Sequence, residues 1–352
     1  MSGTSVDGLD VASARFHQNA TGAWTCDVEA FATLAYPDAM KEALWNVMTL
    51  DAEQLARLDH EWGVWVGREV QSWLLAQRLS SPDVVGSHGH TVFHKPKEGW
   101  TMQIGSGAAL HAALRVPVVC DLRRLDMAFG GQGAPLVPLA DEVLFGEWNV
   151  ALNLGGFANL SIQRPEHGRV AWDVGAANLL LNMLAQTRGL EMDRDGNLAG
   201  QGVLIPELMA QWTALSHHQN PPPKSLGREW LETDVWPLAH QALAQHSLED
   251  VMATAVEYTA WSVVRDVPPG SSVLVTGGGA KNLALLAAIR RLSEGQNHTY
   301  HVPDAALVDG KEALVFAWLG LLRWLGLPNA LPSVTGACQP TCGGAIWGAN
   351  PS

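Results

Sequence analysis

The sequence predicts an α/β fold that contains mixed sheets and is divided into two domains. Short apolar stretches of strand length alternate with longer stretches whose apolar residues recur every three or four positions, as in amphipathic helices. Such alternation is typical of α/β folds. The chain has 352 residues, a length that favours two domains over one.

The amino-terminal part is expected to open with a strand hairpin and to continue with helices and strands in turn. Asp51 precedes the longest helical stretch and can cap its first turn. The expected strands are residues 11–16, 26–34, 84–85, 100–104 and 116–119, and the expected helices are 37–50, 52–79 and 106–114.

A glycine-rich stretch at 130–135 breaks the chain, and we expect the crossing between the domains near it. A second glycine hairpin and then a triple-glycine turn follow. We assign residues 1–120 and 328–352 to the first domain and residues 121–327 to the second. The expected strands beyond the break are 149–154, 159–163, 170–172 and 272–276, and the expected helices are 176–187, 249–266 and 282–292.

Charge and composition exclude several classes of protein. The formal net charge is −13 without a run of basic residues, so neither nucleic acid nor a membrane surface is an expected partner. The most apolar stretch, 313–327, is too short for a bilayer and contains Arg323, which favours a buried helix. No secretion signal is visible, and four scattered cysteines are typical of free thiols in a reducing cytoplasm. We therefore expect a cytoplasmic protein.

The segment Gly3–Asp10, with the sequence GTSVDGLD, combines glycines, hydroxyl groups and carboxylates. Glycine lets backbone amides turn toward an anion, and Thr4 and Ser5 add hydroxyl donors. Asp7 and Asp10 offer the oxygen ligands that Mg²⁺ prefers. The segment could hold a triphosphate and its metal, although it lacks the Gly-Lys-Ser/Thr end of a P-loop. By itself, the segment favours the alternative of a glycine-rich hairpin at the chain terminus.

Eleven short motifs follow one another along nearly the whole chain. They are Gly3–Asp10, His88–His94, Gln103–Gly105, Asp121–Pro138, Asn153–Leu160, Asp173–Leu179, Met192–Gly202, Pro223–Glu229, Thr276–Asn282, Glu312–Leu319 and Asn329–Ala337. Each is weak evidence alone, but in this order they are specific. Together they resemble the motifs of the anhydro-N-acetylmuramic acid kinases, members of the actin and sugar kinase superfamily.

The resemblance implies two actin-like, ribonuclease H-like domains with mixed sheets that flank an ATP cleft. It implies hydrolysis of the 1,6-anhydro bridge of anhydro-N-acetylmuramic acid and phosphorylation of the freed 6-oxygen, with ATP and Mg²⁺. The product would be N-acetylmuramic acid 6-phosphate, formed during the recycling of cell-wall sugars in the bacterial cytoplasm. Members of the family tend to be dimers, so a homodimer is also implied.

The resemblance also assigns residues to the nucleotide. A first phosphate loop, a second phosphate loop and a turn against the adenosine are implied. The cofactor-binding residues are then Gly3, Thr4, Ser5, Val6, Asp7, Gly8, Leu9 and Asp10 in the first loop, Asn153, Gly155 and Gly156 in the second, and Gly277, Gly278 and Gly279 in the turn.

The implied reaction needs a base near the anomeric carbon, and Asp173 is our candidate. Ring opening passes through an oxocarbenium-like state, and a carboxylate that takes the proton of the attacking water is the usual solution. Asp173 follows an apolar stretch and precedes Gly175 and a helix, so we expect it to project from a strand end into the cleft. The alternative is that it only caps the following helix.

The departing bridge oxygen can attack the γ-phosphorus of ATP directly and then needs no acid. Phosphoryl transfer depends on positioning and on neutralisation of charge by Mg²⁺ and backbone amides. Glu312 is a second catalytic candidate, either orienting the water or binding the sugar. A surface glutamate at the start of a helix is an equally weighted alternative.

The residues that the resemblance assigns to the sugar are His88, Gln103, Asp121 and Arg123. An arginine fork matches the lactyl carboxylate of the substrate, and Arg123 fits the family position better than Arg124, which we expect to be solvated.

Two further groups of residues each have two alternative interpretations. His88, His90 and His94 share one face of a strand, but hydrogen bonding or packing is favoured over a metal site. Lys224 and Arg228 belong to a loop, with Ser225 between them, that could close over the ligand or simply be solvated.

The chain departs from the family at its start. Family members carry a short, mostly apolar segment before the Met-Ser-Gly-Thr-Ser motif, and that segment forms the first strand of the first domain. Without that strand, neighbouring backbone groups are expected to be unpaired, and we expect that the start has been assigned at an internal methionine. Ser106 and Asn182 also differ from the residues common in the family.

Two other functions are kept beside the leading one. The first is a kinase of another amino sugar on the same fold, in which Asp173 would activate a sugar hydroxyl. The second is an inactive protein that binds a sugar or a nucleotide without turnover.

Overall fold

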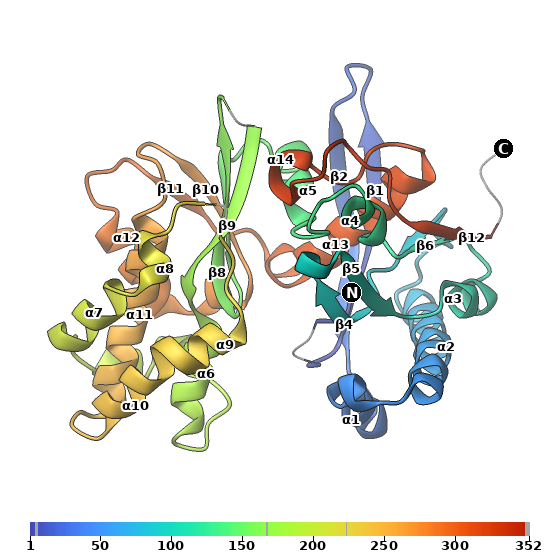
Figure 1. The fold of residues 1–352 in the computed structure, drawn as a ribbon. Helices are drawn as coiled ribbons and strands as arrows, with labels where there is room; N and C mark the ends of the chain where they lie inside the picture. Colours follow the sequence, from blue (N-terminus) through green and yellow to red (C-terminus); the bar gives the residue numbers. More distant parts are fainter. Residues whose placement is uncertain (4–5, 167, 223, 349–352) are drawn as a thin grey trace. The chain divides into compact units, whose positions relative to one another are not determined.

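The computed structural model describes residues 1–3, 6–166, 168–222 and 224–348, and the chain forms two compact units (Figure 1). Unit 1 comprises Met1–Leu144 and Gly310–Ser352, and unit 2 comprises Phe145–Asp309. The crossings therefore lie at 144/145 and 309/310, whereas the sequence analysis placed the boundaries at 120/121 and 327/328.

Unit 1 takes in two helices near the crossings that the sequence analysis assigned to the second domain. Helix α5 (Val137–Val143) and helix α13 (Ala305–Trp324) are joined by an ion pair of 2.6 Å between Asp141 and Lys311, whose side chains are 2% and 6% exposed. A buried charge is retained only with a partner, so this pair holds α5 and α13 together.

The hairpin at the start of unit 1 has the predicted strands with longer ends. Strands β1 (Leu9–Gln18) and β2 (Trp24–Leu34) are antiparallel, with a bulge at Ser13 and Ala14. The expected helix 37–50 divides into α1 (Asp38–Trp45) and the 3₁₀ helix η1 (Val47–Thr49). The division follows from Asn46, which has non-helical backbone angles between them.

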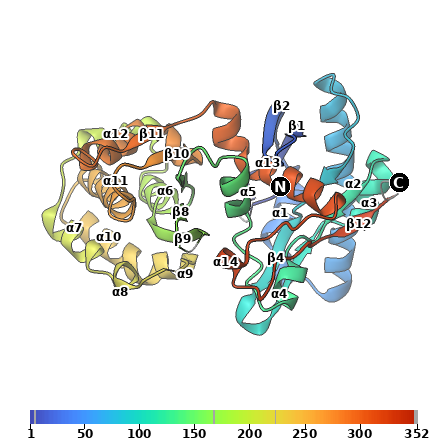
Figure 2. The same ribbon diagram turned by 90° about the horizontal axis from the view of Figure 1, so that it is seen from above.

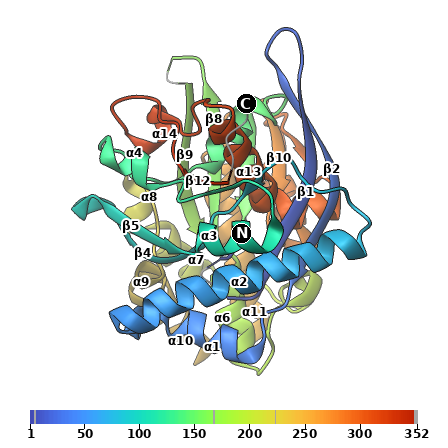
Figure 3. The ribbon, with the colours of Figure 1, turned by 90° about the vertical axis from the view of Figure 1, so that its right-hand side faces the viewer.

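Helix α2 (Ala52–Ala76) is the longest helix of unit 1 and begins as predicted. The Asp51 carboxylate accepts from the Gln54 amide and Gln54 returns a bond to the Asp51 amide, which forms a capping box. Gly63 and Gly67 let α2 approach α3 (Gly107–Leu114), because a Cβ at either position would lie 2.6 to 2.9 Å from atoms in or next to α3. Figure 3 shows the two helices side by side.

The remaining strands of unit 1 are short and form two further sheets. One sheet has the order β12-β6-β3, with β6 parallel to β3 and antiparallel to β12. The other is an antiparallel pair of β4 and β5. The elements are β3 (Val85–Gly86), β4 (His90–Lys95), η2 (Pro96–Glu98), β5 (Trp100–Ile104), β6 (Val118–Cys120), α4 (Arg124–Ala128), α14 (Pro332–Thr335) and β12 (Ala345–Trp347).

A cavity of about 390 Å³ lies in unit 1 against β1, α2, α13 and residues 80–87. Among the described residues, the named sheets pair β1 only with β2 and β3 only with β6. At the edge of β1, Ser2 makes isolated bridges to Leu9 and His90, and the Met1 amine donates to the Asp10 carbonyl at 2.8 Å. Apolar side chains such as Trp62 and Val66 therefore border an open space.

Unit 2 is built on one five-stranded mixed sheet with the order β11-β10-β7-β8-β9. Strands β7 (Val150–Leu154), β8 (Phe157–Arg164) and β9 (Gly168–Ala176) form an antiparallel meander, whereas β10 (Ser272–Thr276) and β11 (Thr299–His301) run parallel to β7. Counted along unit 2, the order is 3-2-1-4-5 read from β9 to β11, as expected of a ribonuclease H-like domain. The predicted α/β class with mixed sheets is confirmed.

Helices cover the sheet of unit 2 and complete its core. Helix α11 is apolar on most of its surface, with buried residues from Leu248 to Val264, and it packs against α6, α12 and the strands β8 and β9 (Figure 2). The helical elements are α6 (Asn178–Gln186), η3 (Arg194–Gly196), η4 (Ala199–Gln201), α7 (Pro206–Thr213), α8 (Ser216–Gln219), α9 (Arg228–Trp230), η5 (Leu231–Val235), α10 (Trp236–Leu243), α11 (Leu248–Val264), η6 (Gly278–Lys281) and α12 (Leu283–Leu292).

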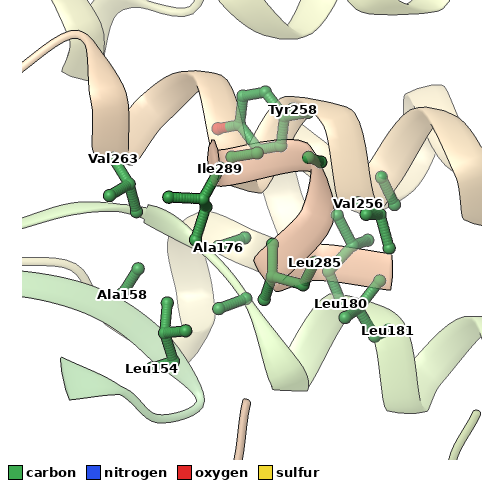
Figure 4. Close-up of a cluster of buried hydrophobic side chains, with 14 of the residues drawn as sticks. Leu154, Ala158, Ala176, Leu180, Leu181, Val256, Tyr258, Val263, Leu285 and Ile289 are labelled. Atoms are coloured by element: carbon green, nitrogen blue, oxygen red, sulfur yellow. The ribbon is translucent and has the colours of Figure 1, made fainter. Parts of the chain in front are cut away.

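The core of unit 2 joins residues that are far apart in the sequence. Figure 4 shows Leu154 and Ala176 from the sheet close to Leu180, Leu285 and other helical side chains. All four of these residues are fully buried, and burial of a leucine side chain stabilises a fold by about 2 kcal/mol.

In the described part of the chain, no helix has the length and apolarity that a membrane span requires.

Candidate active site

The glycine turn between β7 and β8 is held in place by the start of α6. The Gly155 carbonyl accepts from the Asn178 amide at 3.1 Å, and the Gly156 carbonyl accepts from Ala177 at 3.0 Å. The Asn178 side chain also donates to the Leu154 carbonyl at 2.9 Å. With its carbonyls occupied by α6, the turn has a fixed backbone.

The triple-glycine turn after β10 lies directly against this first turn. Gly277 has a φ of +84°, and a Cβ on it would lie 2.5 Å from Oδ1 of Asn153. A Cβ on Gly279 would lie 2.7 Å from the Leu154 side chain. Only glycine fits both the conformation and the space at Gly277. The structure thus brings together two of the three segments assigned to the nucleotide.

Asp173 lies inside β9 and not at its end, which corrects the expected position. Strand β9 continues to Ala176, and the register shifts at this point: Asp173 is opposite Asn159 and Gly175 is opposite Ala158. Val174 is therefore an extra residue in a β-bulge, a feature that re-aims side chains and is common beside active sites.

The Asp173 side chain is half-buried and makes one described hydrogen bond. Its Oδ2 accepts from the Leu226 amide at 2.8 Å. Burial raises the pKa of Asp173 to about 6, and the Leu226 amide opposes this rise. Helix α6 has Ala177 at its N-cap without a side-chain cap, so Asp173 does not cap that helix.

The amino-terminal segment of unit 1 shows an unusual backbone. Thr4 and Ser5 lie outside the described residues. Val6 is buried and has a φ of +52°, which is rare for a β-branched residue and occurs where the surroundings impose it. A Cβ on Gly8 would lie 2.4 Å from the Thr33 methyl group, so glycine is required there as well.

The remaining residues of this segment are divided between the core and the surface. Gly3 is half-buried, Leu9 is buried at the start of β1, and Asp7 is exposed. The Asp10 carboxylate accepts from the Thr33 hydroxyl at 2.6 Å. The exposed Asp7 and the half-buried Asp10 therefore lie on either side of Gly8 in the chain.

Arg123 and His88 are bonded to each other. Nε and Nη2 of Arg123 lie 3.0 and 2.8 Å from Nε2 of His88, and Nη1 donates to the Gly133 carbonyl at 2.7 Å. Nδ1 of His88 lies 3.0 Å from the Gly89 carbonyl, which requires the Nδ1-protonated neutral ring. Burial first, and then Arg123, lower the pKa of His88 well below its usual value.

Glu312 shares an electrostatic environment with Asp10 and Arg123. Although its surface is open to solvent, desolvation by the surrounding protein raises the pKa of Glu312, and Asp10 raises it further while Arg123 lowers it. Burial lowers the pKa of the Met1 amine to about 6, against the opposing effect of Asp10 and Glu312. Asp10, Arg123 and the Met1 amine therefore all act on the pKa of Glu312.

Gln103 and Asp121 have features that favour a role in ligand binding over a purely structural one. Gln103 donates to the Thr101 hydroxyl at 2.8 Å, but its buried Oε1 has no partner among the described residues. Asp121 has a φ of +57° and lies 3.5 Å from Arg124. Burial raises the pKa of Asp121, and Arg124 opposes the rise.

The other two histidines of the 88–94 motif make separate contacts. Nδ1 of His90 lies 2.8 Å from the Ser2 hydroxyl, and Nδ1 of His94 lies 3.1 Å from the Thr101 hydroxyl. Within the residues that the structure describes, no group of three or more histidines, cysteines and carboxylates could hold a metal ion.

Comparisons with known proteins show the family. The model of the anhydro-N-acetylmuramic acid kinase family matches residues 1–349. The chain belongs to this family. A curated anhydro-N-acetylmuramic acid kinase from Aliivibrio fischeri (strain ATCC 700601 / ES114) is 34% identical over 375 aligned positions, which cover 99% of this chain and 98% of the relative. As a member of a kinase family, the protein is a phosphotransferase.

Two solved structures have lower similarity. The activator of 2-hydroxyisocaproyl-CoA dehydratase from Clostridium difficile with bound ADPNP is 16% identical, with a TM-score of 0.35, and covers 61% of this chain and 86% of its own. Component A of (R)-2-hydroxyglutaryl-CoA dehydratase from Acidaminococcus fermentans is 12% identical, with a TM-score of 0.38, and covers 87% of this chain and 99% of its own.

Sequence reasoning missed the part of the site that holds Asp173. His217 and the Lys224 carbonyl both bond the backbone of Asp173, yet only the loop containing Lys224 was noted, as a possible cover. His217 had no signal beyond its residue type, because its partner is a backbone carbonyl 44 positions earlier.

Proposed function

We propose that this protein uses ATP to open the 1,6-anhydro ring of 1,6-anhydro-N-acetylmuramic acid and to phosphorylate O6. The products are N-acetylmuramic acid 6-phosphate and ADP. The observation that carries this proposal is the Asp173 carboxyl group, which lies on a β-bulge, has its pKa raised to about 6, and belongs to a chain of the anhydro-N-acetylmuramic acid kinase family.

Asp173 would act as the general base. A carboxylate with a pKa near 6 is ionised at neutral pH and is a better proton acceptor than an ordinary aspartate. It takes one proton from water while the water oxygen bonds to C1 of the sugar. The C1–O6 bond breaks toward O6, which bonds to the γ-phosphorus of ATP as the bond to the ADP oxygen breaks.

The nucleotide would be held by backbone groups and glycine turns. The contact between Gly277 and Asn153 supports a shared surface for phosphate and adenosine, because turns without side chains expose backbone amides. Asp7 and Asp10 are hard oxygen donors of the kind that bind Mg²⁺, and the bound ion would neutralise phosphate charge.

The sugar would be bound by groups of unit 1. Arg123 keeps one N–H on each of Nη1 and Nη2 beyond its bonds to Gly133 and His88, and these can reach the lactyl carboxylate. The unpartnered Oε1 of Gln103 can accept from a sugar hydroxyl. Glu312, open to solvent beside Asp10 and Arg123, would orient the water or bind the sugar.

An ADP-release assay with 1,6-anhydro-N-acetylmuramic acid tests the proposal. Turnover by the wild type and its loss in Asp173→Asn are expected, and water attack from the face opposite O6 predicts inversion at C1, visible by proton NMR before mutarotation. Consumption of a free amino sugar alone would favour the other sugar kinase. Binding of ATP and sugar without ADP release would favour the inactive binding protein.

Two further expectations belong to this proposal. The family resemblance supports a cytoplasmic location, where ATP and a recovered cell-wall sugar meet, and cell fractionation tests it. The resemblance also supports a homodimer, which light scattering coupled to size-exclusion chromatography tests.

A further inference from the structure

Three atoms of Asp173, in β9, are bonded by residues from one stretch of unit 2: His217 belongs to α8, and Lys224 and Leu226 come shortly before α9 (Figure 1). Nε2 of His217 donates to the Asp173 carbonyl at 2.9 Å. The Asp173 amide donates to the Lys224 carbonyl at 3.1 Å. The Leu226 amide donates to Oδ2 of Asp173 at 2.8 Å. Backbone and side chain are therefore held from the same side.

Two of these residues, His217 and Lys224, are also bonded to each other, which keeps the bonds to Asp173 in register. Nζ of Lys224 donates to the His217 carbonyl at 3.0 Å, and these are the two residues that hold the Asp173 backbone. His217 is 6% exposed, and its ring centroid lies 5.4 Å from that of Trp230. Packing therefore fixes the His217 ring in the position from which Nε2 reaches the carbonyl.

The neutral form of the His217 ring can donate a hydrogen bond from Nε2 to the Asp173 carbonyl at neutral pH. Burial first lowers the pKa of His217, and the cations Lys224 and Arg265 lower it further, whereas the Asp173 carbonyl and Asp266 raise it. The ring is then neutral at neutral pH, and its bond to a carbonyl oxygen places the proton on Nε2. The Asp173 carboxyl itself is influenced by burial and by the Leu226 amide.

We propose that His217, Lys224 and Leu226 form a clamp that positions the Asp173 carboxylate, with His217 as its anchor. The clamp occupies Oδ2 through Leu226 and leaves Oδ1 as the oxygen that accepts the proton. This inference rests on the proposed role of Asp173 as base. His217 acts through Asp173 and is a positioning residue, since its ring bonds the backbone carbonyl of Asp173.

Two matched substitutions separate the hydrogen bond of His217 from its bulk. In His217→Gln the amide nitrogen occupies the place of Nε2 and can still donate to the carbonyl. In His217→Asn the amide nitrogen occupies the place of Nδ1 and does not reach the Asp173 carbonyl oxygen. His218→Asn is the control for local packing, because Nε2 of His218 bonds the Tyr258 hydroxyl at 2.8 Å and not Asp173.

The first readout needs no activity. The Leu226 amide proton bonds a carboxylate, so its NMR shift should follow the ionisation of Asp173, with a midpoint at about pH 6. We expect this titration in the wild type, His217→Gln and His218→Asn, and its loss in His217→Asn and in Asp173→Asn. Retention of the full titration in His217→Asn would overturn the clamp even if the protein proved to have a different activity.

The second readout is kinetic. A catalytic group displaced by about 1 Å can lose about 10²-fold in rate, so kcat of His217→Asn should fall by about that factor while KM for ATP stays unchanged. Rescue by His217→Gln is expected, and equal losses in both variants would overturn the hydrogen-bond explanation. If His217→Asn does not fold, Lys224→Met removes the bond between Lys224 and His217 and should lower kcat and weaken the Leu226 titration. Unchanged values in that variant would also overturn the clamp.

Discussion

The guanidinium of Arg123 directs two of its nitrogens to a single acceptor, Nε2 of His88, at 3.0 and 2.8 Å. The Phe316 ring lies beneath the guanidinium carbon, 5.6 Å from the ring centroid. His88 and Gly133 thus fix the plane of the guanidinium before any ligand binds, and they leave one N–H on each terminal nitrogen free for a carboxylate.

This arrangement predicts that Arg123→Lys lowers kcat/KM for the sugar by about 10²-fold, mainly through KM. A lysine has no planar fork and cannot bond His88, Gly133 and a carboxylate together. Steady-state kinetics with varied sugar and saturating ATP measure the effect. Arg124→Lys is the matched control, because Arg124 is exposed and its ion pair within the described part of the chain is the 3.5 Å contact with Asp121. Equal losses in the two variants would contradict a special role for Arg123.

The turn at Gly277 predicts a loss of nucleotide affinity in Gly277→Ala. The new Cβ would meet Oδ1 of Asn153 at 2.5 Å, so the turn has to shift and the Kd for ATP should rise at least about tenfold, equal to about 1.4 kcal/mol. Isothermal titration calorimetry measures Kd. Gly270→Ala is the control: Gly270 also has a positive φ, +75°, but apart from its two chain neighbours no described residue has an atom within 4 Å of its Cβ position. It should lose stability without losing affinity.

The pKa of Asp173 predicts the acid limb of the rate profile. A general base must be ionised, so kcat/KM should fall tenfold per pH unit below about pH 6, the value to which burial raises this pKa. Stopped assays between pH 4.5 and 8, with stability checked at each pH, measure the profile. An acid limb with a midpoint near pH 4 would indicate that the acting base is an ordinary exposed carboxylate.

The ion pair of Asp141 and Lys311 predicts a large loss of stability when one partner is removed. Both side chains are nearly fully buried, so Lys311→Met leaves an uncompensated carboxylate and should cost about 3–5 kcal/mol. The double variant Asp141→Leu with Lys311→Met should recover most of that loss, because neither charge remains buried. Urea denaturation measures both. A double variant as unstable as Lys311→Met would show that shape, and not charge, decides stability here.

The sequence predicted the regular elements well where a local signal existed. Asp51 with Gln54 fixed the start of α2, and Ser106 caps α3, as the helical pattern from 106 indicated. The helix expected over 37–50 was interrupted at Asn46, because the apolar spacing continued past a residue whose backbone angles are not helical. Motif order identified the family without any three-dimensional information.

The sequence predicted which residues are candidates for the site, but it did not predict how they are arranged in space. Asp173 was found from its motif, but the bulge that places it within β9 depends on its pairing with β8. Arg123 was assigned to a carboxylate, yet its bonds to His88 and Gly133 join positions that sequence spacing cannot relate. The buried pair of Asp141 and Lys311 joins positions that are 170 residues apart, and residue order gives no sign of it.

The sequence by itself determined the family, the α/β class, the glycine turns and the identity of the candidate base, because each of these is encoded in local residue order. Only the tertiary structure decided which oxygen of Asp173 is occupied, which tautomer His88 adopts and why Gly277 tolerates no side chain. The physical reason is that hydrogen-bond partners, desolvation and steric space are set by atoms brought close by folding. Those atoms come from distant parts of the chain, and residue order alone does not state their distances.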